Sequence, residues 1–203
     1  MTGVAHDDRH TVETDHHRID RVLPRFAVAV AVTTAIAWVV VQAMQRSAEF
    51  DLTGQIETVM PLARIGLLTT PILIAVRGGI ATLTAWLMAG ALDDRITMRL
   101  VALGVLTWLP LLELPALVDA IAMLLQPQMG WAGAHVPLGL DAFMEADSPR
   151  LLLLTRSVNL ALLAFAALIA RDFARHVSAG AKVAIPMALA AAAVLVVLPL
   201  LPT

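Results

Sequence analysis

The chain contains no cysteine and no tyrosine, and charged residues make up only 15% of it. Without cysteine there can be no disulfide, iron–sulfur cluster, thiolate metal site or cysteine nucleophile. A formal net charge of −2 supplies no overall basic surface, so we expect no nucleic-acid partner. The sequence also lacks the His-Glu-x-x-His, Gly-x-Ser-x-Gly and Gly-x-x-x-x-Gly-Lys motifs. We therefore expect no enzymatic activity, no catalytic residue and no bound cofactor.

What the chain does have is apolar sequence: hydrophobic residues make up 59% of it, and its mean hydropathy is +0.81. Two uncharged runs, 26–45 and 183–203, each have about the 20 residues that a helix needs to cross the ~30 Å hydrocarbon layer. The first run could instead be a cleaved signal peptide, but it is longer than a signal core and comes after an acidic tail. We therefore expect a multi-pass protein of the cell (inner) membrane, surrounded by the lipid bilayer.

The alternation of apolar and polar segments predicts an all-α integral membrane protein, a bundle of five transmembrane helices in one domain, 24–203. A polar tail, 1–23, precedes this domain and is expected to be disordered. The predicted spans are 24–44, 65–92, 98–125, 150–170 and 183–201. Pro110 and Pro115 predict a kink inside the third span.

The distribution of basic residues predicts how these spans are oriented. If the N-terminus is inside, the basic residues at the inner ends of the spans are Arg9, Arg18, Arg21, Arg25, Arg95, Arg99, Arg171, Arg175 and Lys182. Only Arg46 and Arg150 lie clearly at the outer ends, with Arg64 near that boundary. We therefore expect the N-terminus in the cytoplasm and the C-terminus outside.

Four ionisable side chains fall at membrane depth, namely Arg77, Glu113, Asp119 and Arg156. One charge near the centre of a membrane helix costs about 2.5–3.5 kcal/mol, so such charges should face partners rather than lipid. Arg77 and Glu113 lie near the middles of two antiparallel neighbours, and we predict that they pair. Asp119 and Arg156 fall at a common level nearer the outer face, and we predict a second pair. These pairs either fix the register of the helices or form part of a polar pathway.

The histidines of the chain give no clear metal site. Those of the tail, His6, His10, His16 and His17, stand among aspartates, and such side chains can bind zinc or nickel. Their spacing fits no closed site, so we predict none, although metal binding by the tail stays an open alternative. We interpret His135 and His176 as isolated loop residues without a role.

Three stretches resemble bacterial members of the Yip family, the Ypt/Rab-interacting membrane proteins. They are residues 96–103 together with Trp108-Leu109-Pro110, residues 157–163 at the start of the fourth span, and residues 176–183 before the fifth. The resemblance covers about residues 20–203 and implies five membrane helices with a cytoplasmic N-terminus. In eukaryotes the family is implicated in vesicle trafficking and binds prenylated small GTPases. The tyrosine-containing motifs of that branch have no counterpart here, so no binding residues are carried over.

Two functions compete on this basis. The first is a non-enzymatic scaffold or membrane-organising factor that binds other membrane proteins or its own copies, which the short loops and the lack of a soluble domain and of catalytic motifs favour. The alternative is a small transporter, or the membrane subunit of a transport complex, that uses Arg77, Glu113 and Asp119. A membrane enzyme acting on lipid would have only Glu113 and Asp119 as acids, with no nucleophile beside them.

Overall fold

The structure is a computed structural model that describes residues 21–50, 55–92, 96–129, 135–144, 148–176 and 180–198. Within these ranges the regular structure is entirely helical, apart from one isolated antiparallel bridge between Gly139 and Asn159. The elements in chain order are α2 (Val22–Ala48), α3 (Gln55–Gly90), α4 (Met98–Trp108), η1 (Leu109–Glu113), α5 (Leu114–Leu125), η2 (Pro127–Met129), η3 (Leu140–Ala142), α7 (Pro149–Ser157), α8 (Leu160–His176) and α9 (Ala181–Val197). The tail histidines lie outside the described residues.

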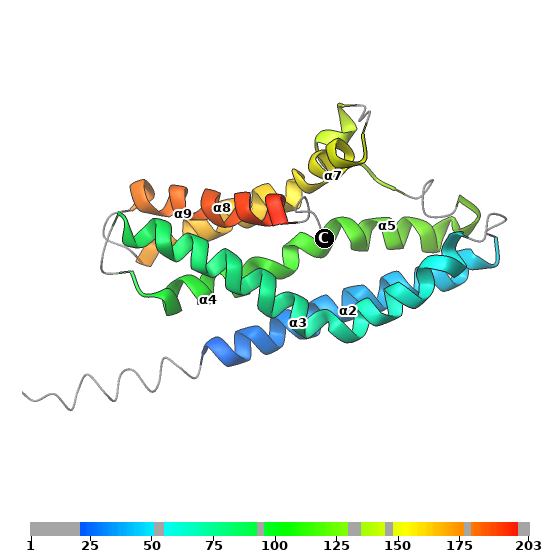
Figure 1. Ribbon diagram of the computed structural model, residues 1–203, viewed down its shortest axis with the longest axis horizontal. Coiled ribbons are helices and arrows are strands. Elements are labelled where there is room, and N and C mark those ends of the chain that lie inside the picture. The colour runs from blue at the N-terminus through cyan, green and yellow to red at the C-terminus, as the bar shows by residue number, and fades with distance from the viewer. Residues whose placement is uncertain are drawn as a thin grey trace, which may run out of the picture.

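Three segments are long and apolar enough to cross a membrane: Val22–Ala48, Thr58–Gly90 and Met98–Leu125. They coincide with the first three predicted spans, although α3 begins at Gln55 rather than near residue 65. Figure 1 shows these segments lying along the long axis of the molecule, with α3 running back beside α2. The 36 residues of α3 extend over about 54 Å at 1.5 Å per residue, which exceeds the hydrocarbon layer.

The third of these segments is interrupted where the two prolines predict it. Proline has no backbone N–H, so Pro110 and Pro115 cannot donate to the carbonyls of Leu106 and Leu111 four residues before them. The chain forms the 3₁₀ helix η1 between α4 and α5, and the Leu114 N–H bonds the Leu111 carbonyl in the tighter pattern. The segment therefore changes its winding in the middle, beside Glu113.

The prediction of one unbroken helix over 150–170 is wrong, because the chain leaves the helix at Val158 and Asn159. The loop before α7 makes a backbone bridge there: the Leu140 N–H donates to the Val158 carbonyl at 3.1 Å, and the Leu160 N–H donates to the Leu138 carbonyl at 3.0 Å. The side chain of Asn159 then caps α8 by accepting from the Leu162 N–H at 3.0 Å. Backbone groups that leave a helix need other partners, and this bridge supplies them.

The loop can come close enough to Val158 to form this bridge only because residue 139 is a glycine. A Cβ atom at Gly139 would stand 2.5 Å from the Val158 carbonyl oxygen, closer than such atoms come. Only a residue without a side chain fits at this position. The break in the predicted fourth span therefore depends on Gly139 of the loop as well as on Asn159 within the span.

Helices α8 and α9 form a hairpin that covers one half of the long segments (Figure 1), with α9 against α3 and α8 against α4. The contact with α9 uses small side chains of α3, and Ala81, Ala85 and Ala89 are fully buried. Phe173 of α8 packs its ring over Gly104 of α4. The other half of the molecule has a second core, made by α2, α3 and α5 from Val41, Ala43, Met44, Ile56, Met60, Ala120 and Met123.

Candidate functional site

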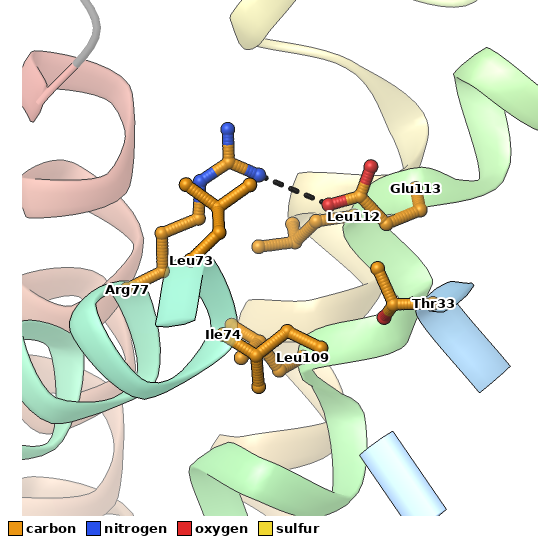
Figure 2. Close-up of a pocket in the computed structure, with 7 residues that line it drawn as sticks. All are labelled: Thr33, Leu73, Ile74, Arg77, Leu109, Leu112 and Glu113. Carbon is orange, nitrogen blue, oxygen red and sulfur yellow. Dashed lines mark hydrogen bonds and ion pairs between the residues drawn. The ribbon is translucent and has the colours of Figure 1, made fainter. Parts of the chain in front are cut away.

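The first polar cluster within the apolar segments is the pair that the sequence predicts between α3 and the end of η1. The Arg77 Nη1 atom donates to Glu113 Oε1 at 3.0 Å (Figure 2). Charge-assisted bonds of this length are among the stronger polar contacts in proteins. The predicted contact is therefore present, and it joins the second and third long segments near their middles.

The close approach of α3 to η1 explains why these side chains can meet. A Cβ atom at Gly78 would lie 3.1 Å from the Leu106 Cδ2 atom and 3.4 Å from the Leu109 Cδ2 atom. Glycine thus leaves room for the leucines of the facing helix, as small residues do where membrane helices pack. Arg77, one residue earlier, is brought within reach of Glu113.

The space beside this pair is small. Thr33 of α2, Leu73 and Ile74 of α3, and Leu109 and Leu112 of η1 surround it together with the pair (Figure 2). The cavity measures about 10 Å³, which is close to the minimum that holds one water molecule. The pair is therefore built to neutralise two charges in place, and this cavity has no room for a solute.

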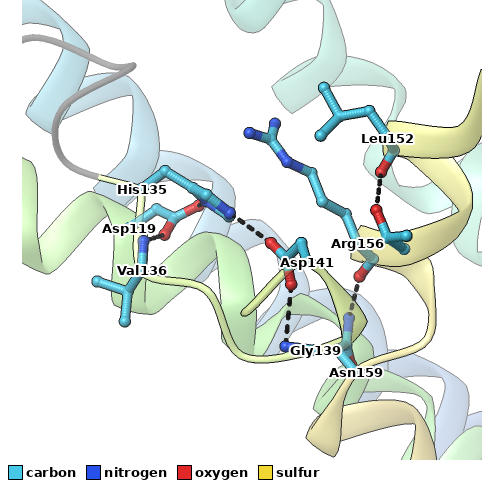
Figure 3. A network of polar contacts seen from close by, with 9 residues as sticks. Asp119, His135, Val136, Gly139, Asp141, Leu152, Arg156 and Asn159 are labelled. Atoms are coloured by element: carbon cyan, nitrogen blue, oxygen red, sulfur yellow. Dashed lines mark hydrogen bonds and ion pairs between the residues drawn. The ribbon is translucent and has the colours of Figure 1, made fainter. Parts of the chain in front are cut away.

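The second predicted pair is wrong, because no ion pair joins Asp119 to Arg156 in the part of the chain that the structure describes. Asp119 of α5 binds the segment before η3 instead (Figure 3). Its Oδ1 atom accepts from the Val136 N–H at 2.8 Å, and its Oδ2 atom lies 3.0 Å from His135 Nδ1. His135 and Val136, from the segment before η3, lie against α5 and take the place expected for Arg156.

His135 is held between two carboxylates. Its Nε2 atom lies 2.7 Å from Asp141 Oδ2, and Asp141 Oδ1 accepts from the Gly139 N–H at 3.1 Å. A histidine can donate to both neighbours only as the imidazolium, with a proton on each ring nitrogen. Figure 3 shows the ring of His135 between Asp119 of α5 and Asp141 of η3, where its charged form can donate to both carboxylates.

The surroundings of His135 favour this charged form. Burial lowers the pKa of His135, but the hydrogen bonds to Asp119 and Asp141 and the negative charge of Asp119 raise it. The positive charge of Arg156 acts in the opposite direction. The net result is a pKa above the ordinary value of 6.5, so this histidine keeps its charge to higher pH than a free one.

The sequence alone does not reveal this cluster, and the interpretation of His135 as an isolated loop residue is wrong. Asp141 stands six residues away and is the one local signal, but acidic loop residues are common beside a membrane. Asp119 comes from another element, and no periodicity connects it to the loop. Only the return of the chain onto α5 brings the three side chains together.

Within the described ranges no group of three histidine or acidic side chains is arranged to hold a metal ion. In the cluster of Asp119, His135 and Asp141, both ring nitrogens already face carboxylates, so neither nitrogen is directed at an open position.

No protein-family model, no curated protein and no solved structure matches this chain. The geometry of the two clusters and the predictions of the sequence are therefore the evidence for its function.

Proposed function

We propose that this is a non-enzymatic, multi-pass protein of the cell (inner) membrane that binds other membrane proteins or further copies of itself. Its N-terminus lies in the cytoplasm and its C-terminus outside. The five passes are α2, α3, the combined segment of α4, η1 and α5, then α8, and finally α9. This is the role that the resemblance to the Yip family implies.

The observation that carries the proposal is the contrast between the inside and the outside of the helices. Inside, Arg77 and Glu113 neutralise each other beside a cavity of about 10 Å³. Outside, α3 exposes large apolar side chains along its whole length, among them Leu62, Leu68 and Leu87. Such a surface suits lipid or another apolar helix, and extended exposed apolar surfaces mark membrane or protein contacts.

The fourth and fifth passes are the part of this topology that most needs a test. Helices α8 and α9 have 17 residues each, or about 25 Å at 1.5 Å per residue. Helices shorter than the ~30 Å hydrocarbon layer are accommodated by local thinning of the bilayer. The apolar character of α9 supports its insertion.

Cysteine labelling tests the topology directly, because the chain has no cysteine and each introduced one is the sole target. A membrane-impermeant maleimide should label Ser148→Cys in intact cells. It should label His10→Cys and Ser178→Cys only after the membrane is opened. Labelling of Ser178→Cys from outside would contradict the five-pass arrangement.

Photo-crosslinking in native membranes tests partner binding. A photoreactive residue in place of Leu68, which is 81% exposed on α3, should give a discrete protein adduct that mass spectrometry identifies. The matched position is Phe165 of α8, which is fully buried and should give none. If Leu68 and Leu87 both yield only lipid adducts, the proposed contact surface is refuted.

The second candidate, a transporter or the membrane subunit of a transport complex, is favoured by one observation. The Arg77–Glu113 pair lies beside the interrupted helix η1, and discontinuous helices with charges near the midplane mark transport sites. This function would use Arg77, Glu113 and Asp119. Saturable solute flux through the purified, reconstituted protein would establish it, provided that Arg77→Met together with Glu113→Gln abolishes flux while the protein stays folded.

A further inference from the structure

The first turns of α2 and α4 meet in a groove that lies apart from both polar clusters. Val22 lines it from α2, and Met98, Arg99 and Ala102 line it from α4. The groove is open to the outside and measures about 350 Å³, within the usual range for small-ligand sites. Three of its four lining residues are apolar, and the fourth is an arginine.

A second arginine lies one turn further along the same seam. Arg25 of α2 reaches across to α4, where its Nη1 atom donates to the Leu103 carbonyl at 3.3 Å and also contacts the Thr107 hydroxyl. Both acceptors are neutral, and no carboxylate of the described ranges lies within ion-pair distance of Arg25. Within the described ranges, its positive charge is therefore positioned on α4 beside neutral groups.

In the proposed topology, this seam lies at the level of lipid headgroups. The long uncharged run of α2 begins at Phe26, directly after Arg25, and Arg21 lies one turn before it. Arginines at the end of a membrane helix extend toward the interface, and basic pockets between helices bind anionic headgroups.

From these observations we propose that the α2–α4 groove at Arg99, together with the neighbouring Arg25, binds the phosphodiester headgroup of an anionic phospholipid. The two guanidinium groups contact the phosphate, and the glycerol and the first part of the acyl chains pack on Val22, Met98 and Ala102. The inference rests on the membrane placement in the proposed function. It adds that this end of α2 and α4 selects lipids by charge.

Native mass spectrometry of the full chain tests the proposal. The detergent-solubilised protein is offered equal amounts of phosphatidylglycerol and phosphatidylcholine with the same acyl chains. An arginine close to an anionic headgroup contributes about a fivefold gain in affinity, so two should favour phosphatidylglycerol by roughly 25-fold. Arg25→Gln with Arg99→Gln should remove this preference, and each single change should reduce it about fivefold.

Two further variants separate charge from folding. Arg46→Gln with Arg150→Gln removes two exposed arginines elsewhere in the molecule and should leave the preference unchanged. Thr107→Val removes the hydroxyl contact of Arg25 but keeps its charge, so the preference should persist even if the protein is less stable. Equal retention of the two lipids by the wild type would overturn the proposal, as would an equal loss in the Arg46 and Arg150 variant.

Two controls keep the possible failures apart. Displacement of the bound lipid by excess inorganic phosphate would show a site for free phosphate and would contradict the lipid assignment. Extraction of cell membranes with alkaline carbonate measures membrane insertion separately. Release of the wild-type protein by carbonate would refute the proposed function, whereas a retained protein without lipid preference would refute only the lipid site.

Discussion

The charged form of His135 should stabilise the fold, and its replacement tests this. The variant His135→Gln keeps a hydrogen-bonding side chain but removes the positive charge between Asp119 and Asp141. Hydrogen bonds to charged groups contribute about 1.5–3 kcal/mol each. The side chains of His135, Asp119 and Asp141 are 22%, 14% and 7% exposed, so water screens them only in part.

The two bonds share one imidazolium, so their contributions do not add fully. We expect His135→Gln to lower the free energy of unfolding by about 3 kcal/mol at pH 6. For a chain of this size, that corresponds to a decrease in Tm of about 6–12 °C. Tryptophan fluorescence during heating of the detergent-solubilised protein measures it.

The effect should depend on pH in a definite direction. The folded-state pKa of His135 lies above 6.5, the unfolded value, so its contribution is fully present below pH 6.5. It is lost as the pH rises through the folded-state pKa, when one ring nitrogen stops donating.

The difference in Tm between wild type and His135→Gln should therefore narrow as the pH rises from 6 to 9. A matched control is His10→Gln, which removes a histidine from the N-terminal tail and should leave Tm unchanged at both pH values. A difference that is the same at pH 6 and pH 9, or no difference at pH 6, would refute the assignment of a charged His135.

Three further changes test the packing and the pair. Arg77→Met should destabilise the protein by about 2.5–3.5 kcal/mol, because it leaves the Glu113 carboxylate at membrane depth without its partner. Adding Glu113→Gln should restore much of this stability, as measured by thermal unfolding. Additive losses of stability in the double variant would contradict the pairing. Gly139→Ala should open the bridge to Val158, because the new Cβ would stand 2.5 Å from the Val158 oxygen. Proteolysis between α7 and α8 should therefore increase. The matched control is Gly79→Ala, where nothing lies within 4 Å of an added Cβ. Phe173→Ala should lower stability by about 3–5 kcal/mol in the same unfolding assay, since the ring is buried over α4; a loss under 1 kcal/mol would contradict that packing.

Local sequence was sufficient for the features that depend on length and hydropathy. The first three predicted spans coincide with long apolar helical segments because each is specified by its own run of residues. The contact of Arg77 with Glu113 could be predicted as well, since two antiparallel neighbours joined by a short connection bring their middles together. Counting residues along a helix is enough to place such a pair.

The predictions that are wrong concern features that depend on contacts between segments distant in the sequence. Nothing in the apolar residues around Asn159 shows that a loop with Gly139 will form a bridge there, although the polar pair Ser157 and Asn159 was a weak signal of an interruption. The same loop carries His135 to Asp119. In that place His135 replaces the expected partner, Arg156. The position of this one loop segment therefore accounts for both errors, the unbroken fourth span and the pair of Asp119 with Arg156.

The 3₁₀ element η1 allows α4 and α5 to pack against different helices. Each 3₁₀ residue rotates about 120° around the axis instead of 100°, so five of them shift the azimuth of α5 relative to α4 by about 100°. The buried stripe of α4, with Val101 and Val105, joins the core of the α8–α9 hairpin, whereas that of α5, with Ala120 and Met123, joins the core shared with α2. The two prolines thus rotate the buried face of α5 relative to that of α4, so that one continuous segment packs against two different sets of helices.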